Sequence, residues 1–524
     1  MKAHIDRRTF LRLAGGVVVT VPAMLVVGCG NSTTMQTTPT KAADEPQRGG
    51  TLRIAVAESM TTLDPTRFFS TTDIYLGFMF YDSLTRRSEG EAGAPIYPGL
   101  AESWEMSDDA LTYTFRLRKG VTFQHGTNFT AKDVEFSIQR LLNPDLGLGP
   151  RSVIRSVIDR LEIIDDYTIR FYLKNPSVTL PFVLGTPGLQ MLPHDRTEEQ
   201  FQKEPSGTGP FRFKEDISGE RIVIVRNDSY WDDGRPYLDE VHLVVIPERT
   251  TAIASLTSGL VDVVEQVGIA DIATLSATEG VQVLESPQGN YPIFLMNVNT
   301  EPFSDLRVRQ ALKHAVDRSA LQKVVLQGRG MIMNDQPVAP YSPLWANVPP
   351  LAYDVEKSKA LLAEAGYPNG LEVTLTIAEI TPGIIEAAVV MQETARAAGI
   401  TININRVPVS SYWNEHYMAT PFFVSFWDLV SEPDSQLSFQ YLSDSPLNES
   451  GWSDPRIDAL IVESSGQRDL ALRKQQSAEL QQIISSEGGG IIPYAIPILT
   501  AVRSNVRGLV PNQFIYAQFI WMVS

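Results

Sequence analysis

Polar and apolar residues alternate along several short stretches of the chain. Residues 112–117 read Thr, Tyr, Thr, Phe, Arg, Leu, which is the period of a strand buried on one face only. A turn at Lys119 and Gly120 precedes the apolar residues of 121–123, and this arrangement predicts a hairpin. The same pattern predicts further strands at 167–173, 221–226 and 241–246.

Helical spacing dominates later in the chain. Apolar residues recur at this spacing from 308 to 316, after Asp305, whose side chain can cap the start of a helix. A second helix is predicted between Asp354 and Gly366, and a third at about 470–485. Strands mixed with helices, without a repeat of solenoid period, predict an α/β fold.

The N-terminal stretch has a pattern of its own. The sequence RRTFL begins at Arg7, an apolar segment spans 13–27, and Gly28 precedes the only cysteine, Cys29. These are the regions of an export signal, and the apolar segment is short for a membrane helix. RRTFL resembles a twin-arginine signal, and the residues ending in Cys29 resemble a lipobox. We expect residues 1–28 to be an export signal and Cys29 to be lipidated; the alternative is a membrane helix with a buried cysteine.

The remainder of the chain is large and acidic. The 524 residues carry a formal net charge of −17, and residues 1–28 contribute +3, so that 29–524 carry −20. This balance argues against binding of nucleic acid or of anionic lipid. The length exceeds what one core usually supports, which predicts two or more lobes. Residues 29–47 are rich in Ser, Thr, Pro and charge, and we expect a flexible tether there.

Motifs for catalysis or for metal binding are missing from the sequence. It has no G-x-S-x-G or H-E-x-x-H motif, and once Cys29 is lipidated no cysteine remains for a disulfide or a nucleophile. The six histidines are scattered, with no two at the spacing of metal ligands. Gly207-Thr208-Gly209-Pro210 lacks the lysine of a nucleotide loop and is interpreted as a tight turn before a strand. We therefore expect neither an enzyme nor a bound cofactor or metal.

Longer segments carry a resemblance that periodicity alone does not supply. The sequence PGLAESWEMSDDALTYTFRLRKGVTFQHGTNFTAKDVEFSI from Pro98 resembles the signature of the peptide/nickel-type, family 5 extracellular solute-binding proteins of bacterial ABC importers. Further matches follow in the family's order: GTGPFRF from Gly207, NDSYWDDGRPYLDEVHLVV from Asn227, LMNVNTEPFSDLRVRQALKHAVDRSAL from Leu295, YDVEKSKALLAEAGYPNG from Tyr353 and WSDPRIDALI from Trp452. Together they cover nearly all of the chain beyond the tether.

The resemblance implies a bilobed periplasmic-binding-protein (Venus-flytrap) fold, of the class with an extra subdomain in the first lobe. Lobe I would comprise residues 48–87, 205–298 and 491–524, and the extra subdomain would be 88–204. Lobe II would comprise 299–490. Hinge crossings would then lie near 297–300 and 488–493.

The resemblance also points to ligand contacts. Peptide-binding relatives have an aspartate four residues before a proline, and it binds the peptide ammonium group; here that position, before Pro433, is Leu429. Asp428 comes one residue early, and strand alternation would turn it to the opposite face unless a bulge intervenes. The candidate ligand-binding residues are Glu58, Ser59, Tyr291, Ser425, Phe426, Trp427 and Asp428. The alternative for 422–428 is a core strand in which Trp427 only packs.

The function implied is a lipid-anchored receptor on the extracytoplasmic face of the cell membrane. It would be a monomer that captures an oligopeptide or other polar solute and delivers it to an ABC permease and ATPase complex. It would meet the membrane only through its lipid anchor and would bind no nucleic acid. Two alternatives stay open: a non-peptide ligand such as an oligosaccharide, an opine-like compound or a chelated metal, and a sensor or chaperone without transport.

Overall fold

The computed structural model describes residues 45–68, 70–87, 96–146, 154–349, 351–512 and 514–523. The predicted export signal, the lipidation at Cys29 and most of the predicted tether lie outside these residues. Among the residues described, no helix combines the length and the apolar character needed to cross a membrane.

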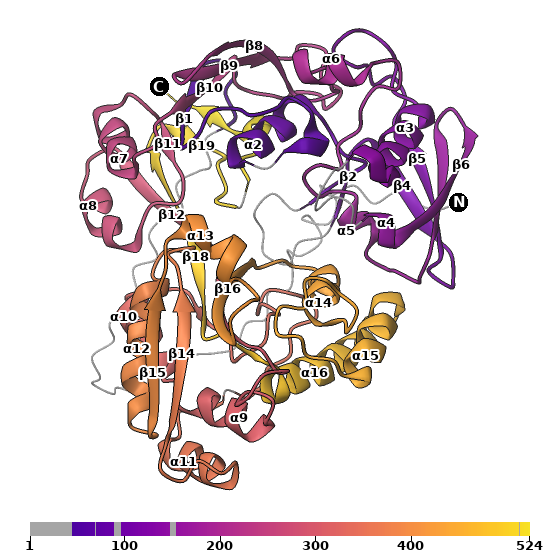
Figure 1. Cartoon of the computed structure of the whole chain (residues 1–524). Helices are drawn as coiled ribbons and strands as arrows, with labels where there is room; N and C mark the ends of the chain where they lie inside the picture. Colours follow the sequence, from indigo (N-terminus) through magenta and orange to yellow (C-terminus); the bar gives the residue numbers. More distant parts are fainter. Residues whose placement is uncertain are drawn as a thin grey trace, which may run out of the picture. The chain divides into compact units, whose positions relative to one another are not determined.

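A twelve-stranded mixed sheet connects segments from both halves of the chain (Figure 1). Its main path runs in the order β15 (Ile400–Arg406), β14 (Leu371–Ile377), β16 (Phe422–Asp428), β12 (Val281–Met296), β18 (Tyr494–Arg503), β11 (Val263–Val264), β1 (Thr51–Val56), β10 (Glu240–Val245), β9 (Arg221–Arg226) and β8 (Phe211–Ile217). β13 (Met331–Ile332) pairs with β18, and β17 (Gly490–Ile491) pairs with β12. The predicted α/β class is confirmed.

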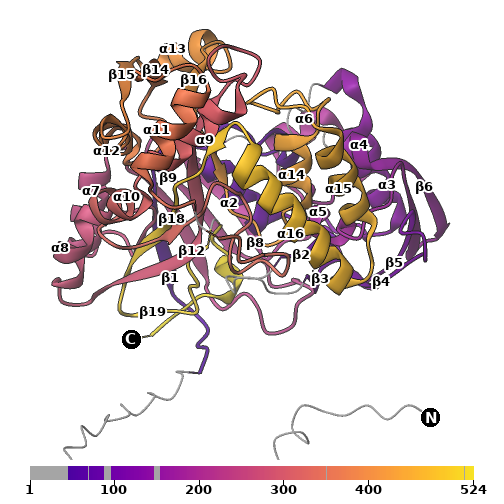
Figure 2. The ribbon, with the colours of Figure 1, turned by 90° about the horizontal axis from the view of Figure 1, so that it is seen from below.

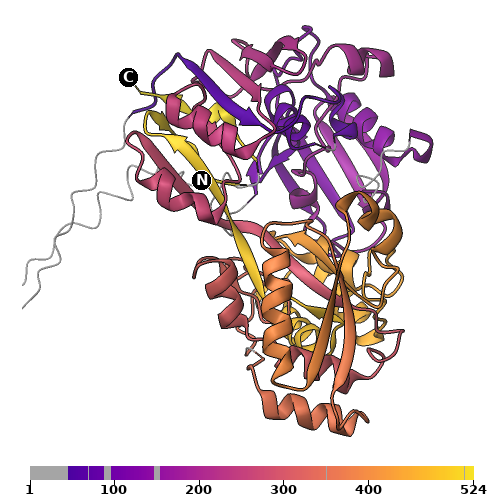
Figure 3. The same ribbon diagram turned by 60° about the vertical axis from the view of Figure 1, so that its left-hand side comes forward.

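β12 changes partners halfway along its length. Residues 281–286 pair with β18, and residues 290–296 pair with β16, with a register shift between Ser286 and Asn290. Gly289 lies at this shift, where an added β-carbon would come within 1.7 Å of the Ile496 carbonyl oxygen, so only glycine allows so close an approach. In Figure 3, the yellow β18 and the pink β12 run from one group of strands into the other. The hinge positions predicted at 297–300 and 488–493 stay predictions.

The residues between β3 (Tyr97–Pro98) and β8 form a separate antiparallel sheet. Its order is β4 (Ala101–Met106), β5 (Thr112–Leu117), β7 (Thr168–Leu173) and β6 (Ile158–Asp165). Phe115 and Phe171 of this sheet belong to a hydrophobic cluster that also includes Val134 and Ile138 of α3 (Ala131–Leu142). This cluster is distinct from the one around β1 and β10 and from the one around β14, so the chain has several cores.

The helices pack around these sheets. Those of the first part are α2 (Thr71–Phe80), α4 (Ile154–Val157), α5 (Leu180–Val183), α6 (Glu198–Lys203), α7 (Arg249–Ser258) and α8 (Ile272–Ser276). Those of the second part are α9 (Leu306–His314), α10 (Arg318–Val325), α11 (Val355–Glu364), α12 (Ile384–Arg396), α13 (Val409–Ser411), α14 (Asp434–Tyr441), α15 (Pro455–Gly466) and α16 (Leu470–Glu487). Figure 2 shows α14, α15 and α16 together, and they share a hydrophobic cluster.

The predicted helix ends are confirmed. The Asp305 carboxylate accepts a hydrogen bond from the Arg307 backbone N–H at 2.8 Å, which caps α9. Asp354 caps α11 by accepting from the Lys357 N–H at 2.9 Å. Gly366 follows α11 with a φ of +95°, a left-handed conformation that favours glycine at a helix end.

One strand prediction is wrong and the others are confirmed. β5, β7, β9 and β10 form where the alternation predicts them. The hairpin after β5 does not form, because both edges of β5 are already taken by β4 and β7. Val121 and Phe123 are apolar because they enter the core of this sheet, and Thr122 makes only an isolated bridge with Asn128.

The glycine-rich segment at 207–210 is a turn that leads into β8, as predicted. A β-carbon on Gly207 would lie 2.0 Å from the carbonyl oxygen of Phe80, the last residue of α2. The Thr208 hydroxyl donates to the Asp82 carboxylate at 3.0 Å. The motif therefore packs the chain against the end of a helix.

Candidate functional site

A small recess forms where segments distant in the sequence meet. It has a volume of about 40 Å³. Its lining residues are Arg87, Phe182, Gln288, Leu429, Val430, Ser431, Asn512, Phe514 and Tyr516. They come from the chain after β2 (Thr85–Arg86), from α5, from the irregular part of β12, from the residues after β16 and from the C-terminal segment. Such a convergence of segments is where a bilobed fold would bind a ligand.

β16 leads from the core to this recess. Residues 422–425 are buried, Trp427 is half-buried, and Phe426 and Asp428 are exposed. The next residue, Leu429, is buried, and its N–H donates to the Gly289 carbonyl at 2.7 Å. The pairing with β12 thus extends one residue beyond the strand and brings Leu429 to Ser431 into the lining of the recess.

A buried carboxylate determines which face of β16 is exposed. Glu449 accepts hydrogen bonds from the Ser425 hydroxyl at 2.5 Å, from the Tyr417 hydroxyl at 2.6 Å and from the Trp427 indole at 2.9 Å. Burial raises the pKa of Glu449, and the three donors oppose that rise. Ser425 and Trp427 therefore point towards Glu449, while the intervening Phe426 lies on the opposite face.

Tyr291 shares a hydrophobic cluster with Leu429, which lines the recess. It pairs with Trp427 across the two strands, and its side chain is fully buried. The hydroxyl accepts hydrogen bonds from the side-chain amides of Gln436 at 3.0 Å and Gln440 at 2.9 Å, both on α14. Burial raises its pKa well above the ordinary value. In this conformation Tyr291 joins β12 to α14.

The structure brings Tyr291 together with residues 425–428, and it places Glu58 and Ser59 elsewhere. Glu58 and Ser59 follow β1; Glu58 is exposed, and its carbonyl accepts a hydrogen bond from the Thr72 hydroxyl at 2.9 Å. Neither lines the recess. Nearby Asp64 has a structural part, because it caps a short helix and forms a buried ion pair of 2.5 Å with Arg140.

Arg87 is a lining residue that sequence reasoning missed. Its guanidinium carbon lies 3.9 Å from the centre of the Phe182 ring. Its Nε is buried without a hydrogen-bond partner among the residues described, and no described carboxylate lies within ion-pair distance. Burial lowers its pKa to about 10, and Tyr516 opposes this shift. No local sequence pattern separates Arg87 from Arg86, so the different surroundings of the two arginines become apparent only in the three-dimensional structure.

Two carboxylates at the ends of β16 and β11 also lack a described cation. Asp428 is solvent-exposed but crowded by surrounding protein, which raises its carboxyl pKa. Glu265 follows β11, and its desolvation raises its pKa well above the ordinary value. β11 runs parallel to β1, so Glu265 and Glu58 follow strands that end at the same edge of the sheet. Glu432 and Asp434, by contrast, both pair with Arg473.

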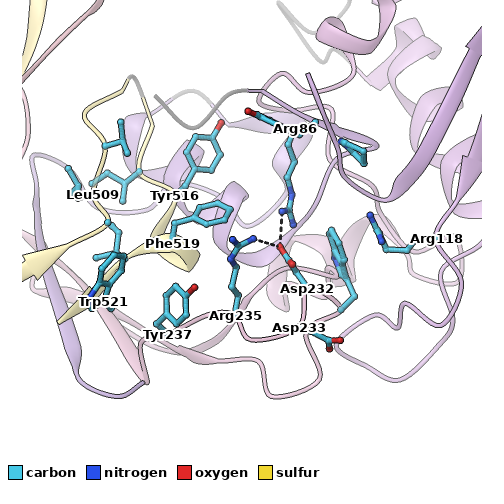
Figure 4. A pocket seen from close by; sticks show the side chains of 17 residues that line it. Arg86, Arg118, Asp232, Asp233, Arg235, Tyr237, Leu509, Tyr516, Phe519 and Trp521 are labelled. Carbon is cyan, nitrogen blue, oxygen red and sulfur yellow. Dashed lines mark hydrogen bonds and ion pairs between the residues drawn. The ribbon is translucent and has the colours of Figure 1, made fainter. Parts of the chain in front are cut away.

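A second recess of about 830 Å³ is shown in Figure 4, and none of its described lining residues belongs to β16. Its charged residues are largely paired with one another: Asp232 binds Arg86 at 2.9 Å and Arg235 at 3.0 Å. Arg118 packs over Trp231 at 4.5 Å. These contacts agree with a framework role for the segment around Trp231, whose indole donates to Asp82 at 2.8 Å. We therefore take the smaller recess as the candidate site.

The arrangement supports binding of a polar solute. Among the described residues, no three His, Cys, Asp or Glu side chains gather as a metal site requires. The described residues that line the recess supply hydroxyl, amide, aromatic and aliphatic groups and the guanidinium of Arg87. Such a set can hydrogen-bond a polar solute and pack against it.

Comparisons with known proteins agree with this picture. The family model for bacterial extracellular solute-binding proteins, family 5 (middle region), matches residues 95–451. Heme-binding protein A of Haemophilus influenzae is 28% identical in sequence, over 97% of this chain and 98% of that protein. Oligopeptide-binding protein AppA of Bacillus subtilis is 30% identical over 91% of each. The solved periplasmic binding protein DppA of Helicobacter pylori, associated with an ABC transporter and in complex with the peptide STSA, matches with a TM-score of 0.78 at 26% identity, over 91% of this chain and 99% of that chain.

Proposed function

Because this chain belongs to family 5 of the bacterial extracellular solute-binding proteins, we propose that it is the lipid-anchored substrate-binding component of an ABC importer. The resemblance seen in the sequence and the bilobed α/β fold class are confirmed. Proteins of this family bind solutes for transport and are not enzymes. The solute proposed here is an oligopeptide or another polar compound, and the protein delivers it to a permease and ATPase complex as a monomer.

The observation that carries this proposal is the convergence at the small recess. Segments on either side of the partner change in β12 contribute to its lining, including Leu429 to Ser431 from one side and Phe182 and Phe514 from the other. A solute held there contacts both groups of strands only when they are close together. Its binding therefore favours the closed arrangement over an open one.

The proposed domain division follows the family. Lobe I is 48–87, 205–298 and 491–524 with the extra subdomain 88–204, and lobe II is 299–490. Two contacts support closure of lobe II onto the subdomain: the Val178 N–H donates to the Ser465 carbonyl at 2.8 Å, and Arg468 pairs with Asp108 at 2.5 Å. The ligand contacts proposed are Glu58, Ser59 and residues 425–428. They would contact the solute in states that differ in how far the two lobes have closed.

A non-peptide solute is the second candidate. The position at which peptide-binding relatives carry an ammonium-binding aspartate is Leu429, which is buried in an apolar cluster with Tyr291 and Phe423. One relative, the Haemophilus influenzae protein, is named for heme binding. These two observations favour testing non-peptide solutes as well as peptides.

A thermal-shift panel tests solute capture. The full chain, purified from the membrane fraction without denaturation, is heated with tri- to pentapeptides, oligosaccharides, heme, opine-like compounds and nickel chelates. A solute that binds only the folded state at 100 times its dissociation constant stabilises the protein by about 2.7 kcal/mol. Stabilisation by one class identifies the solute, and no stabilisation by any class contradicts the proposal.

Membrane fractionation tests the anchor. We expect the wild-type chain in the membrane fraction and the Cys29→Ala variant in the soluble extracytoplasmic fraction, because lipid chains on Cys29 supply the attachment. A Cys29→Ala variant that stays with the membrane would contradict lipid anchoring at this residue.

A further inference from the structure

We propose that the small recess binds an anionic group of the solute, a carboxylate, and that Arg87 is the residue that binds it. This inference rests on the proposed function of the same recess. It goes beyond it by naming the chemical class of the group that is recognised and the side chain that recognises it.

The contrast between two neighbouring arginines is the first support. The Arg86 guanidinium binds Asp232 at 2.9 Å and the Tyr230 hydroxyl at 2.6 Å, and it lies 3.5 Å from Asp82. Arg87 packs over the Phe182 ring and interacts with Tyr516, but no described carboxylate forms an ion pair with it. A guanidinium whose Nε is buried without a hydrogen-bond partner is unfavourable in the empty protein, and a bound anion would reduce that cost.

The composition of the recess is the second support. The described lining residues include no carboxylate, and around Arg87 they include side chains that can donate hydrogen bonds, such as Gln288 and Ser431. Arginine presents paired N–H groups in a plane that matches the two oxygens of a carboxylate. The charged and neutral donors therefore suit an anion, and the described lining residues offer no carboxylate to pair with an ammonium group.

The size of the recess is the third support. Its volume is about 40 Å³, and a water molecule needs at least about 10–15 Å³ of such space. The recess thus has room for a group of a few non-hydrogen atoms, the size of a carboxylate, and not for a whole peptide. The rest of the solute would occupy space that a change in lobe closure opens beside the exposed face of β16.

An intramolecular partner is the alternative to a bound anion. Asp428 precedes Leu429, carries no described cation and is exposed, so a different closure could bring it to Arg87. Strand alternation places it on the face opposite Leu429, and it does not line the recess. In this alternative, Arg87 and Asp428 would serve closure and would not distinguish acidic from neutral solutes.

The test compares matched solutes on the full chain. Tri- to pentapeptides are supplied as free acids and as C-terminal amides, sugar acids are paired with neutral sugars, and opine-like compounds are paired with their esters. Each is measured by thermal shift and titration calorimetry on wild type, Arg87→Gln, Arg87→Lys and Asp428→Asn. Arg396→Gln, which changes an exposed arginine on α12, is the matched control.

The proposal predicts that acids stabilise the wild type and that their neutral counterparts do not. Arg87→Gln should weaken the best acid by at least about 30-fold, Arg87→Lys should weaken it less, and Arg396→Gln should leave it unchanged. If neutral forms bind as well as acids and Arg87→Gln binds both normally, the carboxylate inference is wrong while solute binding stands. Equal losses for both forms in Arg87→Gln and Asp428→Asn would assign Arg87 to closure instead. Absence of binding by every solute class would overturn the proposed function itself.

Discussion

The indole N–H of Trp427 donates to the Glu449 carboxylate at 2.9 Å, and this bond holds the conspicuous tryptophan of β16 away from the exposed face of the strand. The same carboxylate also accepts from Ser425 and Tyr417. All three partners are donors, so they require an acceptor at position 449. The arrangement of the candidate site therefore depends on a residue outside the strand.

Replacing Glu449 by glutamine should destabilise the protein. The amide nitrogen would face one of the three donors and leave it without an acceptor, which costs about 1–3 kcal/mol. Urea unfolding of Glu449→Gln measures this cost, with the exposed Glu479→Gln on α16 as the control. Equal stability of the two variants would show that the buried network contributes nothing.

Replacing Arg87 by methionine should leave the solute-free protein as stable as the wild type or make it more stable by about 1 kcal/mol. Methionine keeps an apolar contact with Phe182 and removes a cation without a described partner. Thermal unfolding of extensively dialysed protein makes the comparison. A loss of several kcal/mol would mean that the guanidinium is satisfied within the folded chain.

Removing one partner of the buried pair Asp64–Arg140, unlike replacing Arg87, should strongly destabilise the protein. Their side chains are 0% and 2% exposed and lie 2.5 Å apart. Among the described residues, Asp64→Asn leaves the guanidinium only the partly exposed Glu198 as a charged partner, and breaking a buried pair costs about 3–5 kcal/mol. Urea unfolding should show this loss, and a change below about 0.5 kcal/mol, the size expected of a surface substitution, would contradict it.

Glu265 should make stability decrease as pH rises. Burial raises its pKa in the folded protein well above the ordinary 4.5, so between these two values the folded state holds a proton that the unfolded state has lost. Stability from this group is therefore fully present below pH 4.5 and is lost as pH rises through the folded pKa. Glu265→Gln should unfold at higher urea than the wild type at pH 8, and the difference should shrink towards pH 4.5. Parallel stability curves for the two proteins would refute the assignment.

Local sequence patterns predicted the helix ends, which depend on residues close together in the sequence. The caps at Asp305 and Asp354 and the stop at Gly366 were predictable because each contacts the backbone within a few residues. The prediction of a hairpin after β5 was wrong. The alternation at 121–123 indicates burial, but it does not indicate that β5 pairs with β4 and β7 instead.

The site depends on contacts between distant segments, and sequence patterns could not supply them. The resemblance located β16, but the partner of Trp427 lies 22 residues further along, at Glu449. Arg87 meets residues from the other end of the chain, among them Asn512 and Tyr516. That no described carboxylate pairs with Arg87 follows from this packing, while the adjacent Arg86 is paired with Asp232.

Native mass spectrometry of the full chain and of a Ser431→Trp variant tests the central claim most directly, which is that a small solute binds in the recess beside β16. Ser431 lines this recess, and an indole there would fill it. Both proteins are purified without denaturation, and circular dichroism checks that the variant is folded. We predict a one-to-one complex with a small solute for the wild type and a bare chain for the folded variant. An identical adduct on both proteins would contradict the account and would direct attention to the larger recess around Trp231.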